Sequence, residues 1–246
     1  MKQKSTNLQS PNSKKTPNHK IQIRNRHSRR RVSPWSFALG FFLGFCAWGL
    51  GVSDDPKPLY QNDFSAAKLG ELPDNEFLVL DGAFEIKQDG DNKFVELPGA
   101  PLDTFSVLFG PSQKSGIRVA ANVFGAKQGR RFPTFAVGVN GAGGYRLQVA
   151  PAKKQIELYK GDELKGHAPF EWQSEKWTQL RLQVHKTGDH WKVEGKAWLQ
   201  GDAEPSAWSV SLDEKEEPSA GRASFWGSPI SEKPIRFDDL SVAPIQ

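Results

Sequence analysis

The chain has 246 residues and a formal net charge of +5, but this charge is unevenly distributed. Residues 1–53 hold ten of the 33 Lys and Arg residues and no Asp or Glu, which leaves 23 basic and 28 acidic residues in the remainder. The larger part is therefore acidic, which excludes a basic nucleic-acid-binding domain and predicts no specific nucleic-acid partner. The single cysteine, Cys46, excludes an intrachain disulfide, so a hydrophobic core must stabilise the fold.

The N-terminal part predicts a disordered tail followed by a membrane span. Residues 1–33 are rich in Ser, Asn, Lys and Pro and almost free of apolar side chains, a composition typical of disorder. Within residues 34–53, the run Trp35–Val52 carries no charge. As a helix it is about 27 Å long, enough to cross the hydrocarbon core of a bilayer. We therefore expect one transmembrane signal-anchor.

The charges that flank this run predict its orientation. Arg29–Arg31 precede it, and Asp54 and Asp55 follow it. Because basic residues stay on the cytoplasmic side, we expect a single-pass protein of the cell membrane with a cytoplasmic tail and an extracytoplasmic C-terminal domain. Two alternatives remain open. The small residues Gly51–Ser53 suit the cleavage site of a removable signal peptide, and the run can also be a buried core helix.

After a linker at 54–59, residues 60–246 predict an all-β domain. Short segments of alternating polarity recur with turn signals between them, and no segment sustains a helical period. The clearest candidates are 84–87, 104–109, 116–124, 132–140, 146–150, 155–160, 177–185, 191–199 and 235–242. About a dozen short strands without disulfides favour a two-sheet antiparallel jelly-roll sandwich.

One hairpin can be aligned from the sequence. Alternation in Trp177–His185 and Trp191–Leu199 gives each segment one apolar face, and a four-residue turn, Lys186–Asp189, pairs the two faces. The outer face then contains these opposite pairs: Gln183 with Lys192, Arg181 with Glu194, Gln179 with Lys196, and Trp177 with Trp198. The match of opposite charges at Arg181 and Glu194 supports this register.

Three further segments predict a second apolar face with a polar reverse side. Alternation in 132–140, 146–150 and 155–160 directs Phe, Val, Leu and Ile side chains to the core. The reverse side then carries small residues beside a convergent polar set: Asn140, Arg146, Gln148, Glu157 and Tyr159. Such a surface suits a ligand groove, and a solvated sheet face with cross-strand ion pairs explains the same pattern.

Several segments resemble a known family. These are Asp63-Phe64, the run Val79–Ile86, the run Gly195–Gly201 and the closing run Ile235–Val242. They resemble concanavalin A-like, laminin-G-like jelly rolls, and in particular bacterial domains of the family 16 glycoside hydrolase-like or keto-disaccharide hydrolase-like group. The resemblance covers roughly residues 60–245. It implies a concanavalin A-like sandwich that binds or cleaves saccharides.

The catalytic pattern of that family is absent. Family 16 hydrolases align two carboxylates on one strand with the spacing Glu-x-Asp-x-x-Glu or Glu-x-Asp-x-Glu, and no such spacing occurs in this chain. Glu157 and Glu194 are the remaining acid–base candidates, and of the two Glu157 is preferred because Arg181 would depress the pKa of Glu194. The sequence therefore favours a domain that is not an enzyme.

Three functions remain as hypotheses. The first is a non-catalytic module that binds carbohydrate or another envelope component through stacking rings and hydrogen-bonding side chains, namely Asn140, Arg146, Gln148, Tyr159, Trp177 and Trp198. The second is a hydrolase acting on di- or oligosaccharides. The third is an envelope scaffold that binds protein. No cofactor is expected. Asp238 and Asp239 offer oxygen ligands for a structural calcium ion, but a strand-end salt bridge or solvated acids are the preferred interpretation.

Overall fold

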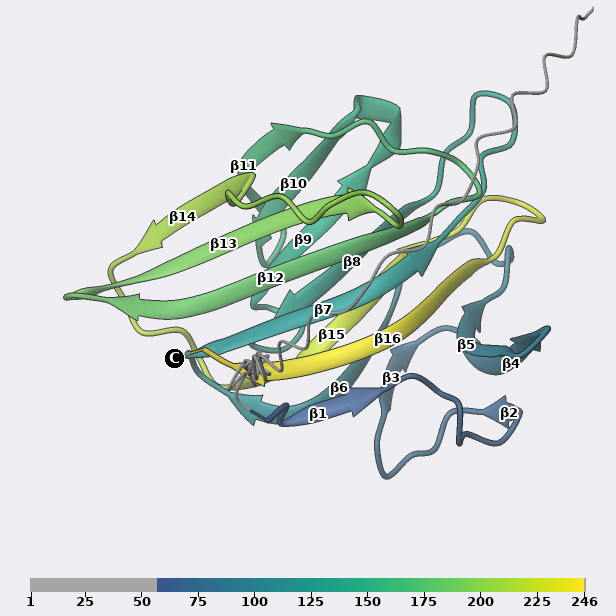
Figure 1. Ribbon diagram of the computed structural model, residues 1–246, viewed down its shortest axis with the longest axis horizontal. Coiled ribbons are helices and arrows are strands. Elements are labelled where there is room, and N and C mark those ends of the chain that lie inside the picture. Colours follow the sequence, from purple (N-terminus) through teal and green to yellow (C-terminus); the bar gives the residue numbers. More distant parts are fainter. Residues whose placement is uncertain (1–56, 246) are drawn as a thin grey trace, which may run out of the picture. The chain divides into compact units, whose positions relative to one another are not determined.

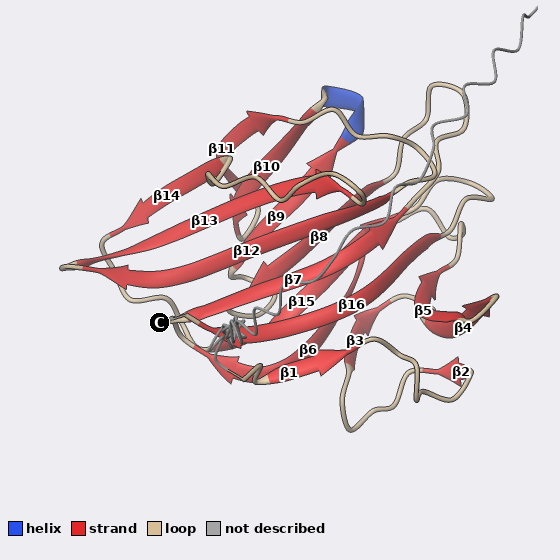
Figure 2. Ribbon diagram, viewed as in Figure 1, coloured by secondary structure: helices blue, strands red, loops and turns tan. Residues whose placement is uncertain are grey.

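The computed structural model describes residues 57–245, whose strands form two antiparallel β-sheets. The two sheets lie face to face (Figure 1). Apart from strands and loops, this part of the chain contains only one short 3-10 helix, η1 (Pro151–Lys153), as Figure 2 shows. The predicted all-β, two-sheet sandwich is therefore confirmed.

Sheet A has nine strands and lies in front of the other sheet in Figure 1. In spatial order its strands are β14 (Val210–Glu214), β13 (His190–Leu199), β12 (Trp177–Thr187), β7 (Ile117–Phe124), β16 (Ile235–Pro244), β5 (Asn92–Leu97), β4 (Glu85–Asp89) and β2 (Gly70–Glu71), with β1 (Tyr60–Asn62) also paired to β16. The last strand of the chain thus lies in the middle of the sheet, next to β7.

Sheet B has seven strands and lies behind sheet A. Its order is β11 (Glu163–Pro169), β10 (Gln155–Lys160), β9 (Tyr145–Ala150), β8 (Thr134–Val139), β15 (Gly221–Ser228), β6 (Phe105–Gln113) and β3 (Leu78–Asp81). Some strands that lie side by side, such as β8 and β15, are far apart in the sequence, so the sheet is not a series of local hairpins.

The core consists of the inward-facing apolar residues of both sheets. The rings of Phe225 on sheet B and Phe237 on sheet A lie 4.7 Å apart, which places their contact at the centre of the interface. Gly195 on β13 marks another close approach, because a Cβ atom there would meet Leu147 Cδ1 of the opposite sheet at 2.6 Å. Alternation of apolar and polar residues along the strands is the reason these faces pair.

The predicted β12–β13 hairpin forms, but in a different register. The loop contains two residues, Gly188 and Asp189, and Gly188 has a φ of +64°, as two-residue hairpin turns require. His185 therefore lies opposite Lys192 and not opposite His190. The predicted pairs slip by two residues: Gln183 faces Glu194, Arg181 faces Lys196 and Gln179 faces Trp198. The apolar faces were predicted correctly and the pairs wrongly.

The predicted apolar face of sheet B is confirmed. Val137 lies opposite Leu147, which in turn lies opposite Leu158, and all three are fully buried. On the reverse side, Gly138, Arg146 and Tyr159 form one row across three strands. Ala136, Gln148 and Glu157 form the next row.

The predicted tail at 1–33 and span at 34–53 lie outside the described residues. Within residues 57–245 there is no helix that is long and apolar enough to cross a membrane. The membrane anchor, its orientation and the linker boundary remain predictions from the sequence.

Candidate functional site

The polar face of sheet B forms as predicted, but its carboxylate is enclosed. Glu157 is fully buried and accepts hydrogen bonds from Lys153 (2.7 Å), Gln155 (2.7 Å), Tyr159 (2.9 Å) and Gln148 (3.3 Å). Burial alone would raise the pKa of Glu157, but the hydrogen bonds from Lys153, Gln155 and Tyr159 outweigh it and keep the pKa below its usual range. A general acid needs the opposite shift, so this environment does not supply the predicted acid–base group.

Asn140 is buried, and its side chain forms hydrogen bonds with two other segments of the chain. It follows β8 with a φ of +66°, and its side-chain amide donates to the carbonyl oxygens of Gln113 (3.0 Å), Lys114 (2.7 Å) and Ser219 (2.9 Å). The predicted groove placed Asn140 beside Arg146 on the sheet. In the structure it lies in the connection after the strand instead, where its amide nitrogen is already hydrogen-bonded and its Oδ1 atom is buried.

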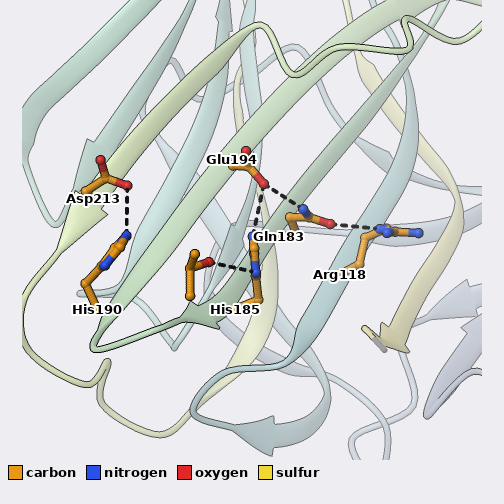
Figure 3. Close-up of polar contacts among 7 residues, drawn as sticks. Arg118, Gln183, His185, His190, Glu194 and Asp213 are labelled. Atoms are coloured by element: carbon orange, nitrogen blue, oxygen red, sulfur yellow. Dashed lines mark hydrogen bonds and ion pairs between the residues drawn. The ribbon is translucent and has the colours of Figure 1, made fainter.

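Glu194, the second acid–base candidate, lies on the outer face of sheet A. Its Oε2 atom accepts a hydrogen bond from Gln183 (2.8 Å) and lies 3.1 Å from His185 Nε2, and Gln183 accepts in turn from Arg118 (3.2 Å). Figure 3 shows this polar ladder crossing from β13 through β12 to β7. The register places Lys196, and not Glu194, opposite Arg181. The ladder is a cross-strand network on a sheet surface and holds Glu194 by hydrogen bonds to its neighbours.

Trp198 is covered and does not present its ring to a ligand. Its side chain is 6% exposed, beneath the connection between β13 and β14. Glu204 from that connection bonds both Lys196 (2.7 Å) and Arg181 (2.5 Å), and the Lys196 ammonium lies 4.6 Å from the ring of Trp208. The predicted cross-strand pair of Trp177 with Trp198 is wrong, because the register places Gln179 opposite Trp198.

A pocket of about 310 Å³ opens on the sheet A side, where the ends of several strands meet. Its lining is polar except for one indole ring. It includes Asp63, Asn92, Asn122, Trp177, Asp238 and Asp239. The structure thus brings together Trp177, predicted as a sugar-stacking ring, with Asp238 and Asp239, predicted as calcium ligands.

The indole of Trp177 is held in place by two phenylalanines. Its ring centroid lies 5.6 Å from that of Phe124 on β7 and 6.4 Å from that of Phe94 on β5. The guanidinium of Arg236 lies 4.5 Å from the centroid of the Phe94 ring and so packs against one of these two phenylalanines. Trp177 itself is half-buried. A fixed, partly exposed ring costs little conformational entropy when a ligand stacks on it.

Two amide–carboxylate pairs form the polar wall. Asn92 donates to Asp238 Oδ2 (2.9 Å), and Asn122 donates to Asp239 Oδ2 (2.6 Å). A β-bulge after Asp238 leaves Asp239 with a φ of +49° and turns it outward. Burial is the main reason why the pKa of Asp238 is raised to about 6, and the charges of Asp239 and Asp63 raise it further. The hydrogen bonds from Asn92 and from the Asp239 N–H lower the pKa, but they do not outweigh the burial.

The predicted calcium site is not evident in this pocket. Within residues 57–245, no group of three or more His, Cys, Asp or Glu side chains is arranged to hold a metal ion. Asp238 and Asp239 each accept a hydrogen bond from an asparagine amide, and part of each carboxylate still faces the pocket. The arrangement suits a neutral ligand rich in hydroxyl groups.

The asparagines of the wall were not found from the sequence. Alternation along 117–124 places Asn122 on the same outward face as Phe124, so this signal was available. Asn92 begins a short strand at a turn, where periodicity says nothing about its direction. Its contact with Asp238 spans 146 positions and depends on the pairing of β5 with β16.

Comparisons with known proteins address the fold. No protein-family model matches the chain, and no curated protein matches its sequence. Among solved structures, the carbohydrate recognition domain of Emp47p is similar with a TM-score of 0.53 and 7% identity, covering 78% of this chain and 98% of that one. A protein from a study of human gut microbiota and their endo-acting O-glycanases for mucin breakdown has a TM-score of 0.50 and 14% identity, covering 77% and 100%. At these identities the likeness shows the β-sandwich fold alone.

Proposed function

We propose that this domain binds carbohydrate, and that a saccharide binds in the pocket of Trp177. The observation that carries the proposal is the position of one packed, half-exposed indole beside the paired carboxylates and amides of Asp238, Asp239, Asn92 and Asn122. The similarity of the fold to a carbohydrate recognition domain supports the proposal.

The chemistry of the pocket matches the two sides of a sugar ring. The C–H face of a pyranose is apolar and packs on the indole, which offers a large apolar surface. The hydroxyl groups at its edge are donors and acceptors. Carboxylate oxygens of Asp238 and Asp239 accept from them, and charge-assisted hydrogen bonds of this kind are the stronger ones. The pocket volume is at the small end of the range of about 300–1,000 Å³ for ligand sites, which suits a short saccharide or one end of a longer chain.

One observation favours a second candidate function, hydrolysis. Asp238 has a pKa of about 6, its neighbour Asp239 is exposed, and both open to the same pocket. Glycoside hydrolases use two carboxyl groups at the bond that is cleaved, and the general acid of the two has a raised pKa. In this case the chain would be an enzyme of the family 16-like or keto-disaccharide hydrolase-like group, with Asp238 in place of the predicted Glu157 or Glu194. Asp238→Asn would then abolish hydrolysis, and it would weaken binding only by the loss of one charge-assisted hydrogen bond.

The location of the domain is part of the same proposal. The uncharged run Trp35–Val52 and the basic cluster before it support a membrane anchor with the domain on the extracytoplasmic side. The ligand would then be a saccharide of the cell envelope or of the surroundings. A scaffold that binds protein and no saccharide is the competing outcome.

A glycan array tests the proposal. The full chain is solubilised in octaethylene glycol monododecyl ether, a detergent that contains neither sugar nor charge, and is compared with Trp177→Ala. A matched control is Trp191→Ala, which removes a half-buried tryptophan at the distant end of the β12–β13 hairpin. We expect a defined set of bound glycans that Trp177→Ala loses and Trp191→Ala retains. A flat profile for the wild type would contradict carbohydrate binding.

A further inference from the structure

One arginine on the outer face of sheet B differs from the others. Apart from it, the half-buried arginines of residues 57–245 all have oxygen acceptors: Arg118 has Gln183, Arg181 has Glu204, Arg222 has two main-chain carbonyls, and Arg236 has Glu96 and Asp89. Within the described chain, Arg146 has neither a hydrogen bond nor an ion pair, and its Nε atom is buried without a partner. A guanidinium in a partly dry site without an acceptor is costly, so it needs an explanation.

Two aromatic rings hold this guanidinium. Its central carbon lies 5.0 Å from the ring centroid of Tyr159 on β10 and 4.8 Å from that of Trp226 on β15. Trp226 reaches Arg146 across β8 because Gly138 lies between them, and a Cβ atom at Gly138 would lie 3.5 Å from the indole nitrogen and collide with the Ser224 hydroxyl. The two ring contacts restrict the Arg146 side chain before any ligand arrives, which lowers the entropy cost of binding.

The positive charge of Arg146 is not neutralised by the polar face around it. Glu157 lies in the neighbouring row, but its carboxylate already accepts from four side chains, including the Lys153 ammonium at 2.7 Å. Gln148 contributes no charge. Since Lys153 balances the charge of Glu157, this carboxylate does not neutralise Arg146.

We propose that Arg146, Tyr159 and Trp226 form a binding site for the anionic group of an acidic saccharide, a carboxylate or a sulfate. A carboxylate or a sulfate group can accept two parallel hydrogen bonds from a guanidinium, and the Nε donor of Arg146 is not used by any protein group. The two flanking rings offer stacking surfaces for the sugar that bears the anion. The site lies on sheet B, opposite the sheet that carries the Trp177 pocket, and it goes beyond the function proposed for that pocket.

The test compares charged and uncharged forms of one saccharide by isothermal titration calorimetry on the full chain in the same detergent. The probes are oligogalacturonate with its methyl ester, and dextran sulfate with dextran. The variants are Arg146→Gln and Arg146→Lys, and the matched control is Arg130→Gln, which removes an exposed arginine with no aromatic neighbours. Trp177→Ala separates this site from the other pocket, and thermal melting of each variant confirms that it is folded.

We expect at least one acidic probe to bind at least tenfold more tightly than its neutral form. Arg146→Gln should abolish this preference, and Arg146→Lys should lose most of it because an ammonium lacks the planar fork, whereas Arg130→Gln and Trp177→Ala should retain it. The proposal is overturned if no acidic probe is preferred, if the preference survives Arg146→Gln, or if Arg146→Lys binds like the wild type. If Arg146→Gln fails to fold, Arg146→Lys decides.

Discussion

The carboxylate of Asp238 gives the wild-type protein a specific dependence of stability on pH. Its pKa in the folded state is about 6, and its usual value is 3.8. Below about pH 3.8 the group is protonated in both the folded and the unfolded chain, so it has no effect. As the pH rises towards 6, the unfolded chain releases the proton first, and the folded state becomes less stable. Above pH 6 the full penalty is present.

The size of the effect follows from the two pKa values. One pH unit of difference corresponds to about 1.4 kcal/mol, so the interval from 3.8 to about 6 gives at most about 3 kcal/mol. Because the pocket opens to solvent, we expect a smaller value, about 1–2 kcal/mol. Asp238→Asn removes the charge and keeps both hydrogen bonds if the Asn92 amide turns over. The variant should therefore be more stable than the wild type at pH 8 and about equally stable at pH 3.5.

Urea denaturation of wild type and Asp238→Asn between pH 3.5 and 8 measures this difference directly. Other acids, such as Glu157, have lowered pKa values and the opposite sign, but they contribute equally to both proteins and cancel in the difference. We expect the stability gap to grow between about pH 4 and 6.5 and then to level off. A gap that is constant across this range would refute the assignment of a raised pKa to Asp238.

Two further predictions concern packing and hydrogen bonding. Gly195→Ala should lower the free energy of unfolding by about 1–3 kcal/mol, because the new methyl group meets Leu147 of the opposite sheet. The control is Gly143→Ala, which should have almost no effect because no atom lies within 4 Å of the new methyl group. Urea denaturation compares the two variants. Glu157→Gln should cost about 2–4 kcal/mol at pH 7, because the Lys153 ammonium loses its charged partner and buried donors lose acceptors. Unchanged stability in this variant would contradict a structural role for the carboxylate.

The sequence predicted the faces of the strands better than their partners. Alternation with a period of two identifies which side chains point inward, and a slip of two residues leaves that pattern unchanged. The apparent charge match between Arg181 and Glu194 was therefore a coincidence of the wrong register. Gly188 contained the missing information, because a glycine followed by Asp189 favours a two-residue loop over a four-residue turn. Loop chemistry, and not charge complementarity, fixes this register.

The candidate site was harder to predict because its parts come from distant strands. Trp177 and Asp238 were both singled out in the sequence, but for unrelated roles. They share a pocket because β7 lies between β12 and β16 in sheet A, an order that alternation cannot reveal. Conversely, Asn140 and Glu157 have the polar character of ligand-binding groups, but their hydrogen bonds are used within the fold. Residue type alone does not separate these two cases.

The most direct test of the central claim is a titration of the isotopically labelled domain, residues 54–246, with the best-bound array saccharide, followed by NMR. The indole N–H signal of Trp177 is assigned by its loss in Trp177→Phe, and the side-chain amides of Asn92 and Asn122 are assigned in the same way. Binding in the proposed pocket predicts that these signals shift together at one affinity. A saccharide that binds while all three signals remain unchanged would contradict the account.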